Sequence, residues 1–159
     1  MFYPNSEFPF TITLENQWRL VERELRALQP QSFVAWPEKF LYEGTWNVFG
    51  FYAFGQKMFG NCALCPDTTR LLESIPGLTT AGFSFLTSGT VIKPHVGYTD
   101  SVLRCHLGLI IPEGCGLRVG NETRKWEHGK CFVFDDTKEH EAWNNGNFDR
   151  TVLLIDFKR

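Results

Sequence analysis

Two histidines of the chain lie beside runs of residues that alternate as β-strands do. His95 lies in the segment KPHVGYTD, which precedes the alternating run Val102–Ile111, and His140 follows a second run, Cys131–Asp135. Residues that border strands of one sheet system can meet at the mouth of a barrel. Neutral imidazole is a ligand for iron, zinc, copper and nickel. A lone histidine is more often a hydrogen-bonded or surface residue, so the pair needs a third feature to support a metal site.

Arg150 is that third feature, because it begins the last alternating run, Arg150–Phe157. Val152 and Leu154 fall on its own face of the strand, so the guanidinium is expected beside apolar side chains. A bidentate carboxylate is the natural partner of such a charge. The order His, His, Arg is similar to that of the iron- and 2-oxoglutarate-dependent oxygenases, where the arginine holds the distal carboxylate of the cosubstrate.

Other residues that could bind a metal are weaker candidates. His95 is followed by Val and Gly97, so the carboxylate of an H-x-D or H-x-E pair is missing. His128 lies in the expected hairpin tip WEHGK and is expected to be solvated. Cys62 and Cys65 form a CxxC pair, but no second CxxC, no correctly spaced Cys-His pair and no βαβ unit accompanies it. We expect these two cysteines to lie in a reduced loop.

The run Val102–Ile111 has one apolar and one polar face. Leu103, Cys105 and the apolar residues that follow at every second position share one face, whereas Arg104 and His106 share the other. Alternation alone leaves two interpretations open. The polar face lines a cavity in a small barrel whose outside is covered, or the run is an edge strand with a solvated polar face.

The remaining patterns indicate helices first and strands afterwards. Glu15–Leu28 has apolar residues at helical spacing and ends before Pro30, and Asp67 can cap a second short helix that buries Leu71, Leu72 and Ile75. From residue 81 onward, apolar residues recur at every second position. The predicted strands are Ala81–Thr87, Val102–Ile111, Leu117–Val119, Cys131–Asp135 and Arg150–Phe157. Short strands after a helical lead-in predict a mainly β barrel or jelly roll with N-terminal helices packed outside.

Composition limits the class of protein. A length of 159 residues predicts one domain, and a net charge of -2 gives no basic surface for nucleic acid. The sequence predicts no signal peptide and no membrane segment. Five cysteines are an odd number and do not suggest a disulfide framework, so we expect a cytoplasmic protein. The sequence gives no indication of an oligomeric state.

The segment PHVGYTDSVLRCHLGLIIPEGCGLRVGNETRKWEHGKCFVFDDTKEHEAW, together with RTVLLIDF, closely resembles the catalytic domain of the aspartyl/asparaginyl β-hydroxylases. The resemblance extends back to Ser84 and the SGT turn, and more faintly to Trp46 and Cys62. It implies a double-stranded β-helix, of the jelly-roll or cupin type. It also implies an Fe(II) centre, 2-oxoglutarate as cosubstrate and dioxygen as the oxidant.

The resemblance implies an iron site with two histidine ligands, His95 and His140. Members of the family that modify peptides have H-x-G in place of H-x-D, so Gly97 is expected to leave a coordination position for water. Asp136 matches an acidic residue that orients such a water molecule by a hydrogen bond. Without the resemblance, the Asp135-Asp136 pair is typical of a solvated turn or an Asx cap.

The resemblance also implies a binding site for the cosubstrate. Ser84 and Arg150 match the pair that holds its C5 carboxylate. Arg104 and His106 match positions near its C1 carboxylate and the acceptor substrate. These roles follow from the family match and not from residue spacing.

The family match predicts hydroxylation of the β-carbon of an Asp-like or Asn-like substrate, which is a free or carrier-bound amino acid or a peptide. The segment Trp46–Gly55 and the residue Val102 are less polar than in human-type enzymes, which predicts a less polar acceptor pocket. Two alternatives remain open. An iron- and 2-oxoglutarate-dependent halogenase would place chloride at the vacant position, and a non-catalytic barrel would only bind a carboxylate ligand.

Overall fold

The computed structural model describes residues 2–159, and its strands form two antiparallel sheets that face each other. The larger sheet has eight strands in the order β1-β11-β8-β13-β6-β4-β2, with β5 paired to β4, and the smaller has five in the order β10-β9-β12-β7-β3. From β6 onward the chain crosses repeatedly between the sheets: β6, β8, β11 and β13 belong to the larger, and β7, β9, β10 and β12 to the smaller. This connectivity is the predicted double-stranded β-helix.

The larger sheet contains the longest strands. Its members are β1 Phe2–Tyr3, β2 Val34–Ala35, β4 Trp46–Ala53, β5 Gln56–Lys57, β6 Leu78–Leu86, β8 Val102–Ile110, β11 Cys131–Phe134 and β13 Arg150–Lys158. The smaller sheet consists of β3 Tyr42–Glu43, β7 Val91–His95, β9 Cys115–Val119, β10 Glu122–Arg124 and β12 His140–Asn144. All five predicted strands are present, with ends that differ by a few residues.

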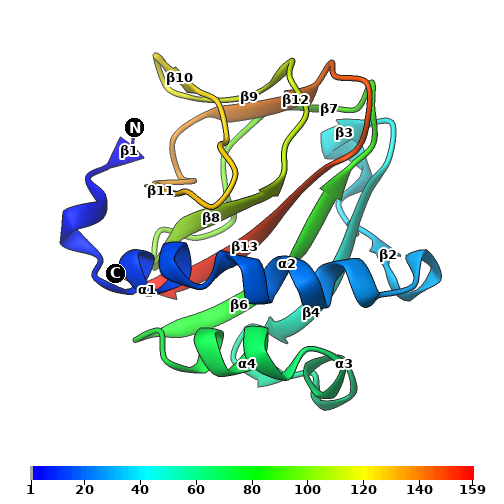
Figure 1. The fold of residues 1–159 in the computed structure, drawn as a ribbon. Helices are drawn as coiled ribbons and strands as arrows, with labels where there is room; N and C mark the ends of the chain where they lie inside the picture. Colours follow the sequence, from blue (N-terminus) through cyan, green and yellow to red (C-terminus); the bar gives the residue numbers. More distant parts are fainter. Residues whose placement is uncertain (1) are drawn as a thin grey trace.

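Four α-helices pack on the outer face of the larger sheet, as predicted. They are α1 Phe10–Asn16, α2 Trp18–Ala27, α3 Phe59–Leu64 and α4 Pro66–Glu73, and short 3₁₀ turns occur at Asn5–Glu7, Pro30–Ser32 and Lys39–Leu41. Figure 1 shows α2 and α4 on one side of this sheet, with β9 and β12 on the opposite side. None of the helices within residues 2–159 has the length and apolar character needed to cross a membrane.

The first predicted helix is confirmed as α2, but it starts later than predicted. The backbone of Gln17 leaves the helical region (φ -120°, ψ 17°) and separates α2 from α1, so Glu15 belongs to the earlier helix. The Glu15 carboxylate accepts a hydrogen bond from the backbone N–H of Cys131, at 2.8 Å. This contact anchors the helical layer to β11, and a helix-period pattern alone could not predict it.

The second predicted helix is confirmed as α4, but Asp67 is not its cap. The backbone N–H groups of Asp67 and Thr68 donate to the carboxylate of Glu24 in α2, at 2.9 and 2.7 Å. The Asp67 side chain instead accepts from Arg70, one turn further along. The cap is therefore supplied by another helix, which satisfies the free N–H groups of the first turn across a tertiary contact.

The prediction of a loop for the CxxC pair is also wrong in part. Cys62 lies within α3, and Cys65 lies at the junction between α3 and α4. Both are buried free thiols in the core between helices and sheet, and burial raises the pKa of Cys65 to about 12. The pair therefore packs as small apolar residues.

Two separate apolar cores follow from the alternation of the strands. Alternate residues of β8, beginning with Leu103 and Cys105, pack against the helices, whereas the core inside the barrel includes Trp126 and Phe134. Because β8 lies between β11 and β13, it is not an edge strand. Arg104 and His106 are each only 7% exposed, which confirms that the polar face of this strand lines the interior.

Candidate active site

His95 and His140 lie side by side on neighbouring strands of the smaller sheet. His95 ends β7 and His140 begins β12, and the two residues are direct partners in the pairing of these strands. Their ring centroids are 4.3 Å apart. The prediction that both only border strands is wrong, because each is part of a short strand. The prediction that they meet is confirmed.

Both imidazoles are held in the same tautomer by their own backbone. His95 Nδ1 lies 2.7 Å from the carbonyl oxygen of Lys93, and His140 Nδ1 lies 2.8 Å from that of Lys138. A carbonyl only accepts hydrogen bonds, so each Nδ1 carries a proton, and in the neutral ring Nε2 is the nitrogen that keeps the lone pair. Such a bond to the remote ring nitrogen is usual for histidines that bind a metal.

The two histidines fit the requirements of an Fe(II) site. Burial lowers the pKa of His140 to about 4, so this imidazole is neutral and able to coordinate near neutral pH. No group of three or more His, Cys, Asp or Glu side chains within residues 2–159 is placed to hold a metal. A metal at this position would therefore have two protein ligands and would leave its other coordination positions to small molecules.

Asp136 fills the space beside Gly97. A Cβ atom added to Gly97 would lie 2.5 Å from Asp136 Oδ2, so a larger side chain there would displace this carboxylate. The Gly97 N–H also donates to the Asp136 carbonyl, at 2.6 Å. Asp136 is 1% exposed, and burial raises its pKa. The turn interpretation therefore fits only its neighbour Asp135, whose Oδ1 accepts from the Thr137 N–H at 3.0 Å.

Arg150 is buried without a carboxylate partner. Its side chain is among the largest fully buried ones in the protein, and its Nη2 donates to the carbonyl oxygen and to Oγ of Ser84, at 3.0 and 3.1 Å. The guanidinium lies 4.6 Å from the ring centroid of Trp126. No carboxylate within residues 2–159 pairs with it, and burial lowers its pKa to about 9. Trp46 Nε1 also donates to Ser84 Oγ, at 2.9 Å, and so fixes this hydroxyl.

His106 presents a hydrogen-bond donor to the same cavity. The indole Nε1–H of Trp126 donates to His106 Nδ1 at 3.0 Å. An indole N–H can only donate, so His106 Nδ1 is the acceptor and its proton is on Nε2. Burial lowers the pKa of His106 well below its usual value, so the ring is neutral. His106 Nε2 is buried and has no partner.

The buried polar atoms without partners gather in one region. Within residues 2–159, the buried side-chain nitrogen and oxygen atoms without a hydrogen-bond partner are His106 Nε2, Asp136 Oδ1 and Arg150 Nε. His106 and Arg150 line one cavity with His95 and His140, and Asp136 lines an adjoining one, which His95 also borders. Buried polar groups are normally satisfied, so three such atoms beside the histidine pair indicate a site for a polar ligand.

Arg104 differs from Arg150 in having a carboxylate of its own. Its Nε and Nη2 donate to Oδ1 and Oδ2 of Asp156, at 2.7 and 2.9 Å, and Asp136 Oδ2 lies 3.7 Å away. Burial by itself would lower the pKa of Arg104, but Asp156 raises it above the usual value. Asp156 was not among the predicted site residues. Its position on the same strand face as Arg150, Val152 and Leu154 was a signal that could have identified it.

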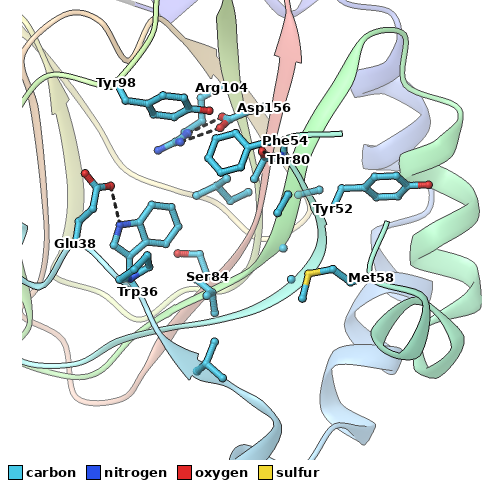
Figure 2. A pocket seen from close by; sticks show the side chains of 18 residues that line it. Trp36, Glu38, Tyr52, Phe54, Met58, Thr80, Ser84, Tyr98, Arg104 and Asp156 are labelled. Carbon is cyan, nitrogen blue, oxygen red and sulfur yellow. Dashed lines mark hydrogen bonds and ion pairs between the residues drawn. The ribbon is translucent and has the colours of Figure 1, made fainter. Parts of the chain in front are cut away.

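A larger apolar pocket adjoins the polar cavity. Figure 2 shows this pocket, whose volume is about 420 Å³, with Trp36, Ser84 and Arg104 among the side chains around it. Ser84, Arg104 and Leu154 line both the pocket and the cavity of the histidines. A ligand in the pocket would therefore reach the histidine pair from the side of β6, β8 and β13.

The fold is that of the 2-oxoglutarate and Fe(II) oxygenases. An oxidoreductase of this family from Burkholderia pseudomallei is similar with a TM-score of 0.71 at 13% sequence identity, over 90% of this chain and 79% of that chain. A prolyl-4-hydroxylase from Pseudomonas putida is similar with a TM-score of 0.58 at 16% identity, over 91% of this chain and 87% of that chain. At these identities the likeness concerns the fold alone.

The sequence comparisons identify the family. Residues 15–159 match the family described as aspartyl/asparaginyl beta-hydroxylase, and the chain belongs to this family. It is 37% identical to an ornithine lipid ester-linked acyl 2-hydroxylase of Rhizobium tropici, over 98% of this chain and 59% of that protein. It is 36% identical to the human aspartyl/asparaginyl beta-hydroxylase, over 91% of this chain and 20% of that protein. The chain therefore spans only part of the length of these relatives.

Proposed function

We propose that this protein is an Fe(II)- and 2-oxoglutarate-dependent hydroxylase in which His95 and His140 hold the metal. One observation carries the proposal. Two imidazoles whose Nδ1 atoms are held by backbone carbonyls face each other beside a fully buried arginine that has no carboxylate partner among the described residues. A metal and a dicarboxylic ligand together would satisfy both features.

The polar residues in and beside the cavity have separate roles in this proposal. Arg150 and Ser84 bind the distal carboxylate of 2-oxoglutarate, and the Nε2–H of His106 donates to its C1 carboxylate near the metal. Asp136 would orient a water molecule beside the metal position by accepting a hydrogen bond through its free oxygen, Oδ1. Arg104 lies at the boundary with the acceptor pocket. When bound, Fe(II) with 2-oxoglutarate and dioxygen supplies the oxidising power that adds oxygen to a C–H bond.

The names of the relatives indicate one common type of acceptor carbon. The β-carbon of Asp or Asn is bonded directly to the side-chain carboxyl or amide carbon, and carbon 2 of an acyl chain is bonded directly to the ester carbonyl. We therefore propose hydroxylation of a carbon next to a carboxyl-derived group. An Asp-like or Asn-like substrate, either free, carrier-bound or in a peptide, satisfies this description, and so does an acyl chain.

The metal assignment is tested by Fe(II) titration under anaerobic conditions. His95→Ala and His140→Ala should each abolish Fe(II) binding, because a site with two protein ligands cannot compensate for the loss of one. His128→Ala is the matched control, since His128 is exposed and its contacts, a hydrogen bond from the Ile111 N–H and stacking on Trp18, lie away from the histidine pair. Parental Fe(II) affinity in either of the first two variants would show that the metal assignment is wrong.

The alternatives are tested by the products. A hydroxylase consumes dioxygen, releases succinate and adds one oxygen atom to its acceptor. A halogenase would add chlorine when chloride is present, and a binding protein would give neither succinate nor product. Mass analysis of the acceptor with and without chloride, together with succinate release, separates the three functions.

A further inference from the structure

The loop between two strands of the site has little packing of its own. Residues 96–101 connect β7, which ends at His95, to β8, which carries Arg104. None of these six loop residues is buried, and its large hydrophobic side chains, Val96 and Tyr98, are 61% and 57% exposed. Few buried contacts therefore fix the position of the loop, and it depends on hydrogen bonds to other segments.

Hydrogen bonds to Asp136 and Arg159 tie this loop near both of its ends. Near its start, the Gly97 N–H donates to the Asp136 carbonyl oxygen at 2.6 Å. Near its end, Arg159 Nε donates to the carbonyl oxygen of Asp100 at 2.5 Å. The backbone N–H of Arg159 donates to the carbonyl oxygen of Ser101, at 3.2 Å. The loop is thus held by one residue of the site and by one residue outside it.

Arg159 also binds the turn that carries Asp136. It directly follows β13, and its Nη2 lies 2.7 Å from Asp135 Oδ1. The same Oδ1 accepts from the N–H and the hydroxyl of Thr137, at 3.0 and 2.6 Å. Burial alone would raise the pKa of Asp135, but the hydrogen bonds from Arg159 and Thr137 lower it to about 2, so this carboxylate is charged near neutral pH. One guanidinium therefore joins the turn to the loop between β7 and β8.

Asp136 lies between the attachments of the loop and of the turn. Its backbone accepts from Gly97, and its buried Oδ1 has no hydrogen-bond partner among the described residues. It lines a cavity together with His95 and Gly97. A movement of the loop against the turn would change where this free oxygen points relative to His95. The direction of the carboxylate therefore depends on how firmly the two segments are joined.

We propose that Arg159 is a positioning residue, which clamps the loop 96–101 to the turn 135–137 and so holds Asp136 in its place beside His95. The inference rests on the proposed hydroxylase function, in which Asp136 orients a water molecule. Arg159 lines neither of the two cavities that His95 borders, and its side chain is 36% exposed. It therefore acts on the reaction through Asp136 and the loop, and not by contact with a ligand.

The first measurement is hydrogen exchange of the Gly97 amide in the metal-free protein, followed by NMR. Arg159→Met should raise the exchange rate of this amide about fivefold, the equivalent of one net hydrogen bond, while the amides of β8 and β13 keep their rates. Arg70→Met is the matched control, because Arg70 is an exposed arginine whose carboxylate partner, Asp67, lies in its own helix. An unchanged rate at Gly97, or an equal rise throughout β8 and β13, would overturn the proposal.

The second measurement separates positioning from ligand binding. Succinate release is followed with Fe(II), 2-oxoglutarate and dioxygen, and the affinities for Fe(II) and 2-oxoglutarate are measured anaerobically. Arg159→Met should lower kcat about fivefold and leave both affinities unchanged, because the residues proposed to bind these ligands lie on strands. Asp135→Asn should lower kcat to the same extent, and the double variant should lose no more than either single one. Additive losses, or losses of affinity in place of kcat, would overturn the positioning role.

Failure of this inference can be distinguished from failure of the proposed function. A parent protein that binds neither Fe(II) nor 2-oxoglutarate overturns the hydroxylase, and with it the role of Arg159 in the reaction. A parent that binds both and releases succinate, with Arg159→Met unchanged in exchange at Gly97 and in kcat, leaves the hydroxylase and overturns the positioning role. Faster exchange at Gly97 together with a lower kcat supports both.

Discussion

Two buried arginines on neighbouring strands of one barrel have opposite surroundings. Arg104 of β8 is 7% exposed and holds Asp156 of β13 by two hydrogen bonds. Arg150 of β13 is 1% exposed, and its hydrogen bonds reach only Ser84. The first arginine has its counter-ion within the protein. The second has none among the described residues, and the difference indicates which arginine supports the fold and which one binds a ligand.

The difference has an energetic basis. An isolated buried charge is strongly unfavourable, and proteins usually pair it or neutralise it. Burial accordingly lowers the pKa of Arg150, whereas Asp156 raises that of Arg104 in spite of its burial. A protein that keeps an unpaired buried guanidinium has a site that an incoming carboxylate stabilises. The histidine cavity therefore offers a counter-charge to a ligand that carries a carboxylate.

The proposed role of Arg104 near the C1 carboxylate remains a prediction, and the geometry limits it. The Nε and Nη2 atoms of Arg104 already donate hydrogen bonds to Asp156. A second anion would have to share the guanidinium with Asp156 and with Asp136, which lies 3.7 Å away. His106, with a buried Nε2–H that has no partner, is the better placed donor for that carboxylate.

The largest expected effect comes from breaking the internal pair. Asp156→Asn removes the carboxylate that pairs with Arg104 through two hydrogen bonds and leaves it only the more distant Asp136, at 3.7 Å, so it should lower the free energy of unfolding by about 3 kcal/mol. Urea denaturation measures this change. The double variant Arg104→Met, Asp156→Leu is the control, because replacing both partners by apolar residues should restore most of the lost stability. A loss below about 1 kcal/mol in Asp156→Asn would show that the two arginines do not differ as described.

The second prediction addresses the arginine without a carboxylate. Arg150→Met should weaken 2-oxoglutarate binding by about 2 to 5 kcal/mol, which is about 30-fold or more in affinity. It should leave the free energy of unfolding unchanged or raised, because it removes an unpaired buried charge. Anaerobic calorimetry and urea denaturation give the two quantities. A large loss of stability with unchanged 2-oxoglutarate affinity would assign Arg150 a structural role instead.

The strands that form the frame of the site could be predicted from the sequence, because they alternate over many residues. The runs 102–111 and 150–157 became β8 and β13, with Arg104, His106 and Arg150 facing the interior as alternation requires. The strands β7 and β12 could not be predicted, although they carry His95 and His140. Each has only five residues, and one of them contains a proline, so neither shows a clear period of two.

Contacts between distant parts of the chain account for most of what the sequence could not predict. The carboxylate of Glu24 caps a helix that starts more than 40 residues later in the chain. The filling of the space at Gly97 by Asp136 depends on how two loops pack, and no local pattern reports it. The double-stranded β-helix, by contrast, was implied by the family resemblance, and the family match covers residues 15–159.

The smallest expected effect concerns Trp126, which contacts both His106 and Arg150, the two residues proposed to bind the carboxylates of 2-oxoglutarate. Trp126 donates to His106 Nδ1 at 3.0 Å and lies under the Arg150 guanidinium, so it fixes the imidazole with its proton on Nε2. Trp126→Phe keeps an aromatic face for Arg150 but removes the N–H donor, so His106 becomes free to place its proton on either nitrogen. We expect 2-oxoglutarate affinity to fall by about 0.5 to 1.5 kcal/mol, which is the usual net value of one hydrogen bond.

NMR of isotope-labelled imidazoles reads the tautomer directly, and with only four histidines in the chain, His106→Gln assigns the signal. If His106 keeps a single Nε2–H tautomer in Trp126→Phe, Trp126 acts on the site only through packing, and the difference between the two arginines does not depend on it.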